Sequence, residues 1–278
     1  MKLLFDEYCK SASKLVTKYY STSFYAGVTC LGKELRDDVH NIYGFVRLAD
    51  EIVDSFHNFN KKKLLSEFKK ETKSSIEQGI SLNPILNSFQ NTVNKYKIDR
   101  KLIDQFLHSM EMDLNPIKYT NEKYEEYILG SAEVVGLMCL KIFVNGSESN
   151  YERLKPSAMT LGSAFQKINF LRDIKDDINN LGRVYFPNIE KNHFNDQNKK
   201  DIEIEIEKEF NAALKGIKML PNSSKYGVFL SYSYYEKLLQ KIKRKSAEDL
   251  LKERVRISNF LKLIILKKIY LKKIFKLF

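Results

Sequence analysis

The sequence is short of the residues that interrupt helices. It contains 5 prolines, 11 glycines and no tryptophan in 278 residues, while 43% of its residues are hydrophobic. Because turns draw on glycine and proline, this composition favours a compact and mostly helical body with a sizeable core. Glycine-rich phosphate loops and internal repeats are also missing from the sequence, which disfavours the common nucleotide-binding folds and solenoids.

Cysteine and histidine are too scattered for a zinc site. The three cysteines are odd in number and show no C-x-x-C spacing, which is typical of buried thiols in a reducing compartment. The four histidines have no metal-ligand spacing either. These residues are Cys9, Cys30 and Cys139, and His40, His57, His108 and His193.

Long apolar runs are missing as well. A spanning helix needs about 18 uncharged apolar residues, and no window of the sequence approaches that length. The first ten residues carry Asp6 and Glu7 where a signal peptide would continue its apolar run. We therefore expect a cytoplasmic protein, or one that binds peripherally to the inner face of the cytoplasmic membrane.

The net charge of +12 suggests an anionic partner: nucleic acid, a membrane surface or a phosphorylated substrate. Six lysines and no acid lie between Phe260 and Phe278, which leaves about +6 on the rest of the chain. Outside this tail the lysines form no stripe with interleaved aromatic residues, so we expect no nucleic-acid partner. The oligomeric state is not predicted.

Apolar residues recur every three or four positions over most of the sequence, which predicts helices. The stretch IEIEIE at 202–207 alternates like a strand, but Ile202, Ile206 and Phe210 also have helical spacing, and we expect a helix. Gly130 and Gly136 lie inside an expected helix and predict close approach of another helix or a ligand. The expected helices cover 6–20, 33–56, 63–79, 85–96, 99–114, 122–144 and 226–243, with a further long helix after Pro156.

The helix after Pro156 ends in an acidic motif, QKINFLRDIKDDINNLGRVYFP at 166–187. Asp173 and Asp177 are four residues apart, which places both carboxylates on one face, about 6 Å apart along the helix axis. Gln166 and Asn169 continue the same stripe. Such a pair can share a divalent cation, although acids on a helix more often lie on a solvated face.

A second copy of this spacing strengthens the metal interpretation. Arg47, Asp50 and Asp54 lie on one stripe of the helix expected at 33–56. Four carboxylates on two facing helices would repel one another unless cations lay among them. Magnesium, or manganese in its place, suits carboxylate and phosphate oxygens, and arginines bind the remaining phosphate oxygens. Beside an aromatic-lined cavity, such a site suits ionisation of an allylic diphosphate.

These motifs resemble the squalene and phytoene synthases, a family of head-to-head prenyltransferases. The resemblance covers the chain up to about residue 258 and includes YSTSF at 20–24, YGFVRLADEIVD at 43–54, YILGSAEVVGLM at 127–138 and the motif at 166–187. It implies an all-α, single-domain isoprenoid-synthase helical bundle with a central cavity, followed by a tail at 259–278. On spacing alone, Ser21 and Ser23 would cap a helix.

The resemblance also implies roles for individual residues. Asp50, Asp54, Asp173 and Asp177 would be the catalytic, magnesium-binding residues. Asp113 matches a recurrent acid to which the resemblance gives no role, and Arg256 is an alternative to Arg254. Val134, Val135 and Gly136 would join Phe24 in an apolar channel. The substrate-binding residues would be Ser21, Ser23, Phe24, Tyr43, Arg47, Tyr127, Gln166, Asn169, Arg172 and Arg254, with Tyr127 at a polar mouth.

The family resemblance is nearest to bacterial phytoene synthases, which join two geranylgeranyl diphosphates through prephytoene diphosphate and need no NADPH. Phytoene is the first committed product of carotenoid biosynthesis. One alternative is a squalene, dehydrosqualene or presqualene-type synthase that uses farnesyl diphosphate. A non-catalytic assembly factor is another, although that role would predict eroded acid motifs, and all four aspartates are present.

The tail is basic and amphipathic. On a helical wheel one side carries Leu263, Leu266, Tyr270, Ile274, Leu277 and Phe278, and the other carries Lys262, Lys268, Lys272, Lys273 and Lys276. Lys267 intrudes on the apolar side. This pattern predicts either a helix that lies on an anionic membrane or an ordinary terminal helix that packs on the body.

Overall fold

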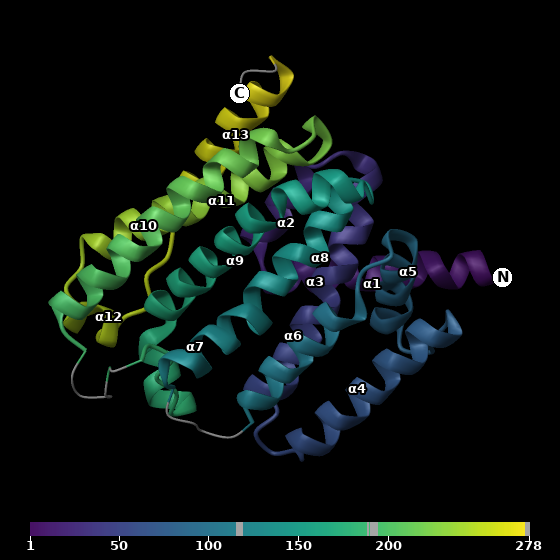
Figure 1. Cartoon of the computed structure of the whole chain (residues 1–278), viewed down its shortest axis with the longest axis horizontal. Coiled ribbons are helices and arrows are strands. Elements are labelled where there is room, and N and C mark those ends of the chain that lie inside the picture. The colour runs from purple at the N-terminus through teal and green to yellow at the C-terminus, as the bar shows by residue number, and fades with distance from the viewer. Residues whose placement is uncertain (115–118, 188, 190–193, 276–278) are drawn as a thin grey trace.

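The computed structural model describes residues 1–114, 119–187, 189 and 194–275. These residues form helices and no strand, which confirms the all-α fold. Figure 1 shows α9, α10 and α11 along one side of the molecule and α4 on the opposite side, with α3, α6 and α8 between them. The helices are α1 (Lys2–Tyr20), α2 (Thr22–Thr29), α3 (Lys33–Asp54), α4 (Lys61–Gln78), α5 (Pro84–Tyr96), α6 (Arg100–Met112), α7 (Asn121–Ile128), α8 (Val134–Phe143), α9 (Glu148–Asp176), α10 (Asp196–Met219), α11 (Asn222–Lys243), α12 (Ala247–Lys252) and α13 (Asn259–Ile274), with π-helical turns η1 (Leu129–Glu133) and η2 (Asp177–Leu181).

Several helix boundaries differ from the sequence prediction. The expected helix at 122–144 is divided into α7, η1 and α8. α9 begins at Glu148 and carries Pro156 in its interior, whereas we expected it to begin after this proline. A proline in a helix lacks the N–H group that would bond to the carbonyl four residues earlier, but the apolar residues on both sides still pack. The IEIEIE stretch lies within α10, so its helical prediction is confirmed.

Glycines bring helices close together around η1 and α8. A Cβ atom at Gly130 would lie 2.7 Å from the carbonyl oxygen of Gln105 in α6, and one at Gly136 would lie 3.0 Å from that of Ala158 in α9. Both distances leave no room for a larger residue. The expected close approach is therefore a helix contact, which positions α8 between α6 and α9.

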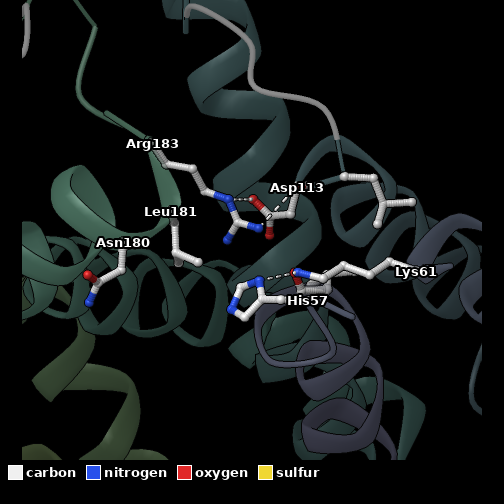
Figure 2. A pocket seen from close by; sticks show the side chains of 8 residues that line it. His57, Lys61, Asp113, Asn180, Leu181 and Arg183 are labelled. Atoms are coloured by element: carbon white, nitrogen blue, oxygen red, sulfur yellow. Dashed lines mark hydrogen bonds and ion pairs between the residues drawn. The ribbon is translucent and has the colours of Figure 1, made fainter. Parts of the chain in front are cut away.

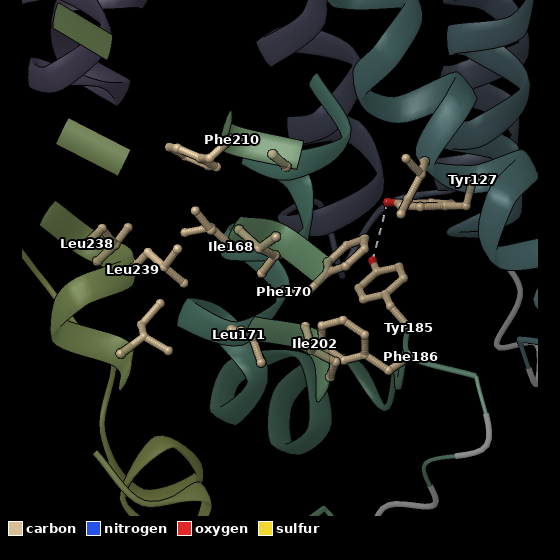
Figure 3. Close-up of a cluster of buried hydrophobic side chains, with 14 of the residues drawn as sticks. Tyr127, Ile168, Phe170, Leu171, Tyr185, Phe186, Ile202, Phe210, Leu238 and Leu239 are labelled. Carbon is tan, nitrogen blue, oxygen red and sulfur yellow. Dashed lines mark hydrogen bonds between the residues drawn. The ribbon is translucent and has the colours of Figure 1, made fainter. Parts of the chain in front are cut away.

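Two hydrophobic clusters support the two acidic helices. α3 packs in the first cluster, where the rings of Phe45 and Phe89 stack with centroids 3.8 Å apart. α9 packs in the second, which includes Ile168 and Leu171 together with Phe210 of α10 (Figure 3). Because burial of apolar side chains fixes each helix in its own cluster, the acid motifs meet where the two clusters adjoin.

The terminal helix α13 packs on α11 with one apolar stripe and exposes another. Ile265 and Ile269 are buried in a third cluster with residues of α11, and the Tyr234 hydroxyl donates a hydrogen bond to the Lys262 carbonyl at 2.9 Å. The stripe that we placed on the apolar face is the exposed one, since Leu263, Tyr270 and Ile274 are 48%, 55% and 56% exposed. Leu266 packs partly against the third cluster. Lys276, Leu277 and Phe278 lie outside the described residues.

Candidate active site

The first acid pair lies on α3 beside Arg47. Arg47 Nη1 donates to Asp50 Oδ2 at 2.5 Å, and Nη2 donates to Glu51. The guanidinium carbon lies 4.4 Å from the ring centroid of Tyr20, a cation–π contact. Its Nε atom is buried and has no hydrogen-bond partner among the described residues. A buried donor without a partner is costly, so this nitrogen suits an anionic ligand.

The second acid pair lies at the end of α9. Arg172 binds Asp173 through two nitrogens, with Nε to Oδ1 at 2.9 Å and Nη2 to Oδ2 at 2.5 Å. Asn169 Nδ2 donates to Gln166 Oε1 at 3.2 Å, and the Tyr235 hydroxyl of α11 donates to Asn169 Oδ1 at 3.0 Å. The predicted polar stripe is thus oriented by α11 as well as by its own helix.

Of the two late arginines, the structure brings Arg254 to the site. Arg254 Nε lies 2.6 Å from Asp173 Oδ1. Arg256 is exposed and contributes its carbonyl to a hydrogen bond from Lys241. The segment that follows α12 therefore supplies a cation to the second acid pair.

Arg183 connects the two acid pairs. Its Nη1 donates to Asp54 Oδ1 at 2.7 Å, and its backbone N–H donates to the Asp177 carbonyl at 2.8 Å. Gly182, just before it, ends η2 with φ of +67°, a left-handed conformation that favours glycine. This turn directs the chain back toward α3, so that Arg183 reaches the first acid pair from the second.

The acid pairs influence one another electrostatically. Burial, and then the charge of Asp54, raises the pKa of Asp50 to about 7. Burial, and then the charges of Asp173 and Asp54, raises the pKa of Asp177 to about 8, although Arg183 opposes the shift. Because Asp54 acts on a residue of each pair, the pairs form one site. Raised pKa values of this kind indicate carboxylates that lack sufficient positive charge.

Small hydroxyl and aromatic residues lie beside the first acid pair. Ser21 caps α2 by accepting a hydrogen bond from Phe24 N–H at 3.2 Å, as its sequence position predicted, and Ser23 follows in the first turn. The ring of Phe24 stacks on that of Tyr43, with centroids 4.7 Å apart. Burial raises the pKa of Tyr43 to about 12. These residues form an aromatic wall with a polar edge.

Tyr127 does not lie at an open mouth, so its predicted position is wrong. The side chain is buried, with 4% of its surface exposed, and its hydroxyl donates to Asp113 Oδ2 at 2.7 Å. Figure 3 shows its hydroxyl directed toward that of Tyr185. Tyr127 is drawn inward because its ring packs against those of Phe170 and Tyr185.

The first acid pair is partly accessible to solvent. The Asp50 side chain is 34% exposed and the Asp54 side chain is 31% exposed. Cys139 of α8 is half-buried, and burial raises its pKa to about 12. Val135 is also half-buried, whereas Val134 is buried in the core and is not part of a channel wall. Val135 and Cys139 both pack against the hydrophobic cluster that contains α3.

A small pocket of about 190 Å³ lies beside Arg183. Its lining includes Asp113 and Arg183 on one side and His57 and Lys61 on the other (Figure 2). Lys61 Nζ lies 3.2 Å from His57 Nδ1 and donates to the Val53 carbonyl near the end of α3. The pocket therefore has a largely polar lining.

The carboxylates present suit a divalent cation, although the described residues contain no group of three acidic, histidine or cysteine side chains with metal-ligand geometry. Three of the four motif aspartates instead bond arginines, and these pairs are Asp50 with Arg47, Asp54 with Arg183 and Asp173 with Arg172. The four aspartates would offer only oxygen atoms to a metal, and the pKa values of Asp50 and Asp177 are raised. Oxygen donors that need positive charge are those that magnesium and manganese prefer.

Two solved structures share this all-helical fold. A dehydrosqualene synthase in complex with ligand aligns with a TM-score of 0.79 at 19% identity and covers 96% of this chain and 98% of its own. The squalene synthase HpnC from Alicyclobacillus acidocaldarius aligns with a TM-score of 0.72 at 19% identity, covering 86% of this chain and 93% of its own.

The sequence profile described as squalene/phytoene synthase matches residues 17–260, and the chain belongs to this family. Phytoene synthase 2, chloroplastic, from Oryza sativa subsp. japonica is 27% identical over 259 residues, 86% of this chain and 64% of that protein. Phytoene synthase 2, chloroplastic, from Solanum lycopersicum is 27% identical over 242 residues, 80% of this chain and 77% of that protein. The chain thus spans about two thirds of the rice protein's length.

The structure adds residues that the sequence did not assign to the site. Tyr235 orients Asn169, and Tyr20 lies on Arg47. Lys262 of α13 lies with Nζ 3.4 Å from Thr22 Oγ1, and burial together with the charges of Arg172 and Arg256 lowers its pKa. The helical wheel places Lys262 on the polar side of the tail, because nothing in the local pattern shows that α13 begins beside α2.

Proposed function

We propose that the protein is a magnesium-dependent prenyltransferase that joins two geranylgeranyl diphosphates head to head to form phytoene. The observation that carries this proposal is the pair of acidic helices, bordered by arginines, with the stacked rings of Phe24 and Tyr43 beside the first acid pair. Arg47, Arg172 and Arg254 would bind diphosphate oxygens. This is supported by their contacts with the motif aspartates and by the buried Arg47 donor that has no partner among the described residues. Family membership supports prenyl transfer as the reaction class.

Divalent cations would be held by Asp50, Asp54, Asp173 and Asp177. The bound metal would neutralise the charge that develops on diphosphate as it leaves. The protein's own residues would orient the diphosphates through the arginines, while Gln166 and Asn169 would supply amide contacts on the same stripe. The ring of Phe24, stacked on Tyr43, would stabilise the cation that remains on the prenyl chain.

The reaction needs no reductant. Joining the two chains to give prephytoene diphosphate releases one diphosphate and one proton. Ionisation of that intermediate releases the second diphosphate, and loss of a second proton from the rearranged cation gives phytoene. The proposal therefore includes no NADPH. The two named phytoene synthases support C20 substrates, while the two solved structures support the fold alone.

Farnesyl diphosphate is the alternative substrate, which would give a squalene, dehydrosqualene or presqualene-type product. The depth of the substrate channel would select between C15 and C20 chains. A non-catalytic assembly factor is disfavoured because the acids and arginines remain together in one site.

The first experiment incubates the purified chain with each prenyl diphosphate and magnesium, and separates the hydrocarbon products by chromatography. We expect phytoene from geranylgeranyl diphosphate without NADPH. Asp173→Asn should lower turnover by at least about 100-fold, because it removes the charge of a proposed metal ligand. Asp176→Asn, which changes a neighbouring carboxylate bonded only to Asn180 in the described set, is the control. A Asp173→Asn variant with wild-type turnover would contradict the metal assignment.

The exposed face of α13 supports a second proposal, peripheral binding to an anionic membrane. Leu263, Tyr270 and Ile274 form an exposed apolar stripe, and Lys267 and Lys268 are exposed on the same helix. Each lysine near an anionic surface adds about 1 kcal/mol of attraction. Among the described residues, no helix is long and apolar enough to cross a membrane. The proposed division of the chain into a domain at 1–258 and a tail at 259–278 follows this difference in role, although α13 packs on the body.

A further inference from the structure

The residue that ends α6, Asp113, lies behind the candidate active site and has not been given a role. Its side chain is buried and accepts hydrogen bonds from two tyrosines. The Tyr127 hydroxyl donates to Oδ2 at 2.7 Å, and the Tyr185 hydroxyl donates to Oδ1 at 3.0 Å. Arg183 Nε lies 3.5 Å from Oδ1. A buried carboxylate with these partners has little freedom to move.

Arg183 lies between this carboxylate and the first acid pair. On one side, Nη2 donates to the Asp113 carbonyl at 2.9 Å and Nε faces the Asp113 carboxylate. On the other side, Nη1 donates to Asp54 Oδ1 at 2.7 Å and to the Tyr185 hydroxyl at 3.2 Å. Figure 2 shows the guanidinium group directed at Asp113 at the edge of the pocket. The orientation of the guanidinium plane is thus fixed by Asp113 through Nε and Nη2, and by Tyr185 and Asp54 through Nη1.

Aromatic packing keeps the two tyrosines in place. The rings of Phe170 and Tyr185 stack with centroids 4.2 Å apart, and the Tyr127 ring lies 4.9 Å from that of Tyr185. Phe170 belongs to α9 and Asp113 follows the last residue of α6, so the network of Asp113, Tyr127, Tyr185 and Phe170 contains no residue of α3. It therefore orients the Arg183 side chain independently of the first acid pair.

We propose that Asp113 is a positioning residue that holds Arg183 in the orientation in which a single nitrogen reaches Asp54. The inference rests on the proposed function, because Asp54 is a proposed metal ligand. The Asp113 carboxylate balances the buried guanidinium charge from behind. Without that charge, Arg183 turns toward the motif aspartates and competes with a cation for their oxygens. Asp113 therefore acts on metal diphosphate binding through Arg183, without touching substrate.

The main test compares Asp113→Asn with a matched control, Asp38→Asn. Both aspartates are 9% exposed, and Asp38 likewise accepts from a tyrosine, with Tyr96 at 2.9 Å, and binds a cation, Lys95, at 2.7 Å. Asp38 belongs to the contact between α3 and α5, away from the acid pairs. Both variants are expected to lower thermal stability, since each removes a buried charge from its partners.

Calorimetric titration with magnesium and inorganic diphosphate, well below the unfolding temperature, separates the two roles. We expect Asp113→Asn to bind at least about tenfold more weakly than wild type and Asp38→Asn to bind within about twofold of it. If Asp113→Asn binds as tightly as wild type, Asp113 does not position Arg183 for binding. If Asp113→Asn does not fold, Tyr185→Phe replaces it, since that change removes a hydrogen bond from both Asp113 and Arg183.

A second measurement decides the inference even if the proposed function fails. Should wild type not bind magnesium diphosphate, the proposed function is contradicted, and the arginine can still be followed by its rate of modification with phenylglyoxal. Arg183 is buried in wild type. We expect its modification, measured by mass spectrometry, to be several-fold faster in Asp113→Asn and unchanged in Asp38→Asn. Equal rates in wild type and Asp113→Asn would overturn the positioning role.

Discussion

At the scale of single residues, three of the four motif aspartates bond arginine side chains before any ligand binds. Asp50 forms an ion pair with Arg47, and Asp54 forms one with Arg183. Asp173 forms ion pairs with both Arg172 and Arg254. Entry of a metal diphosphate would exchange these partners, with cations taking the carboxylates and phosphate oxygens taking the arginines. These three carboxylates would then have a positively charged partner both before and after binding, which limits the penalty of burying their charge.

Arg254 provides a test of this exchange. Arg254→Ala should lower kcat/KM by roughly 10-fold to 100-fold, because a charge-assisted hydrogen bond contributes about 1.5 to 3 kcal/mol. Arg256→Ala is the matched control, since this neighbouring arginine is exposed and does not contact an acid of the motif in the described residues. We expect the control to change kcat/KM by less than about twofold. The reverse order of effects would assign the diphosphate contact to Arg256.

The sequence identified the motif aspartates and most of the arginines, because helical spacing places them on stripes. It could not identify the partners of Asp113, since Arg183 lies 70 residues away in the chain. Tyr127 was misplaced for a related reason: nothing in the local sequence shows that its hydroxyl points inward to Asp113. Contacts of this kind depend on how distant elements pack.

At the scale of elements, regular spacing predicted the helices well and their interruptions poorly. A π-helical turn such as η1 is only five residues long and is not marked by a proline, so apolar spacing alone does not reveal it. Pro156 predicts the start of a helix, but it lies in the interior of α9, which begins at Glu148. For α13, the helical wheel predicts one apolar stripe, and Ile265 and Ile269 form a second one. Which of the two stripes is buried depends on how the helix packs against α11.

The exposed stripe of α13 predicts membrane binding. Replacing both Leu263 and Ile274 by glutamate should weaken sedimentation with vesicles that contain phosphatidylglycerol by about tenfold or more, because apolar burial is lost and the helix becomes less basic. Ile204→Glu on α10 is the control, since Ile204 is also an exposed isoleucine. Wild type should not sediment with neutral phosphatidylcholine vesicles. Unchanged sedimentation of the double variant with anionic vesicles would exclude this face as the contact.

At the scale of the whole molecule, the site forms where two hydrophobic clusters meet, and each cluster supplies one acidic helix. The sequence predicted both helices and the all-α class, but their relative placement follows from packing between segments more than 100 residues apart in the chain, as in the Asp54–Arg183 ion pair. The stability of the molecule and the ionisation of its site are consequently linked.

This linkage gives a pH dependence. The pKa values of Asp50 and Asp177 are raised to about 7 and about 8 in the folded protein, above those of an unfolded aspartate. Such groups stabilise the folded state at low pH, and their contribution is lost as the pH rises through the folded pKa values. Without metal, the melting temperature should therefore fall as the pH rises from about 6 to about 9.

Magnesium should oppose this fall, since it binds the ionised carboxylates, and its stabilising effect should be larger at about pH 8.5 than at about pH 6. Asp177→Asn should flatten the metal-free dependence, while Asp176→Asn should preserve it. Differential scanning fluorimetry across the pH range measures both effects. A magnesium effect of equal size at the two pH values would argue against binding at these aspartates.

Lys262 and Thr22 join the two ends of the chain next to the aromatic wall, because Thr22 lies between Ser21 and Ser23 and Lys262 lies in the first turn of α13. If α13 rests on a lipid bilayer, this contact could couple the binding of diphosphate in the active site to the binding of the protein to the bilayer. Any factor by which lipid changes the affinity for diphosphate must then equal the factor by which diphosphate changes the affinity for lipid.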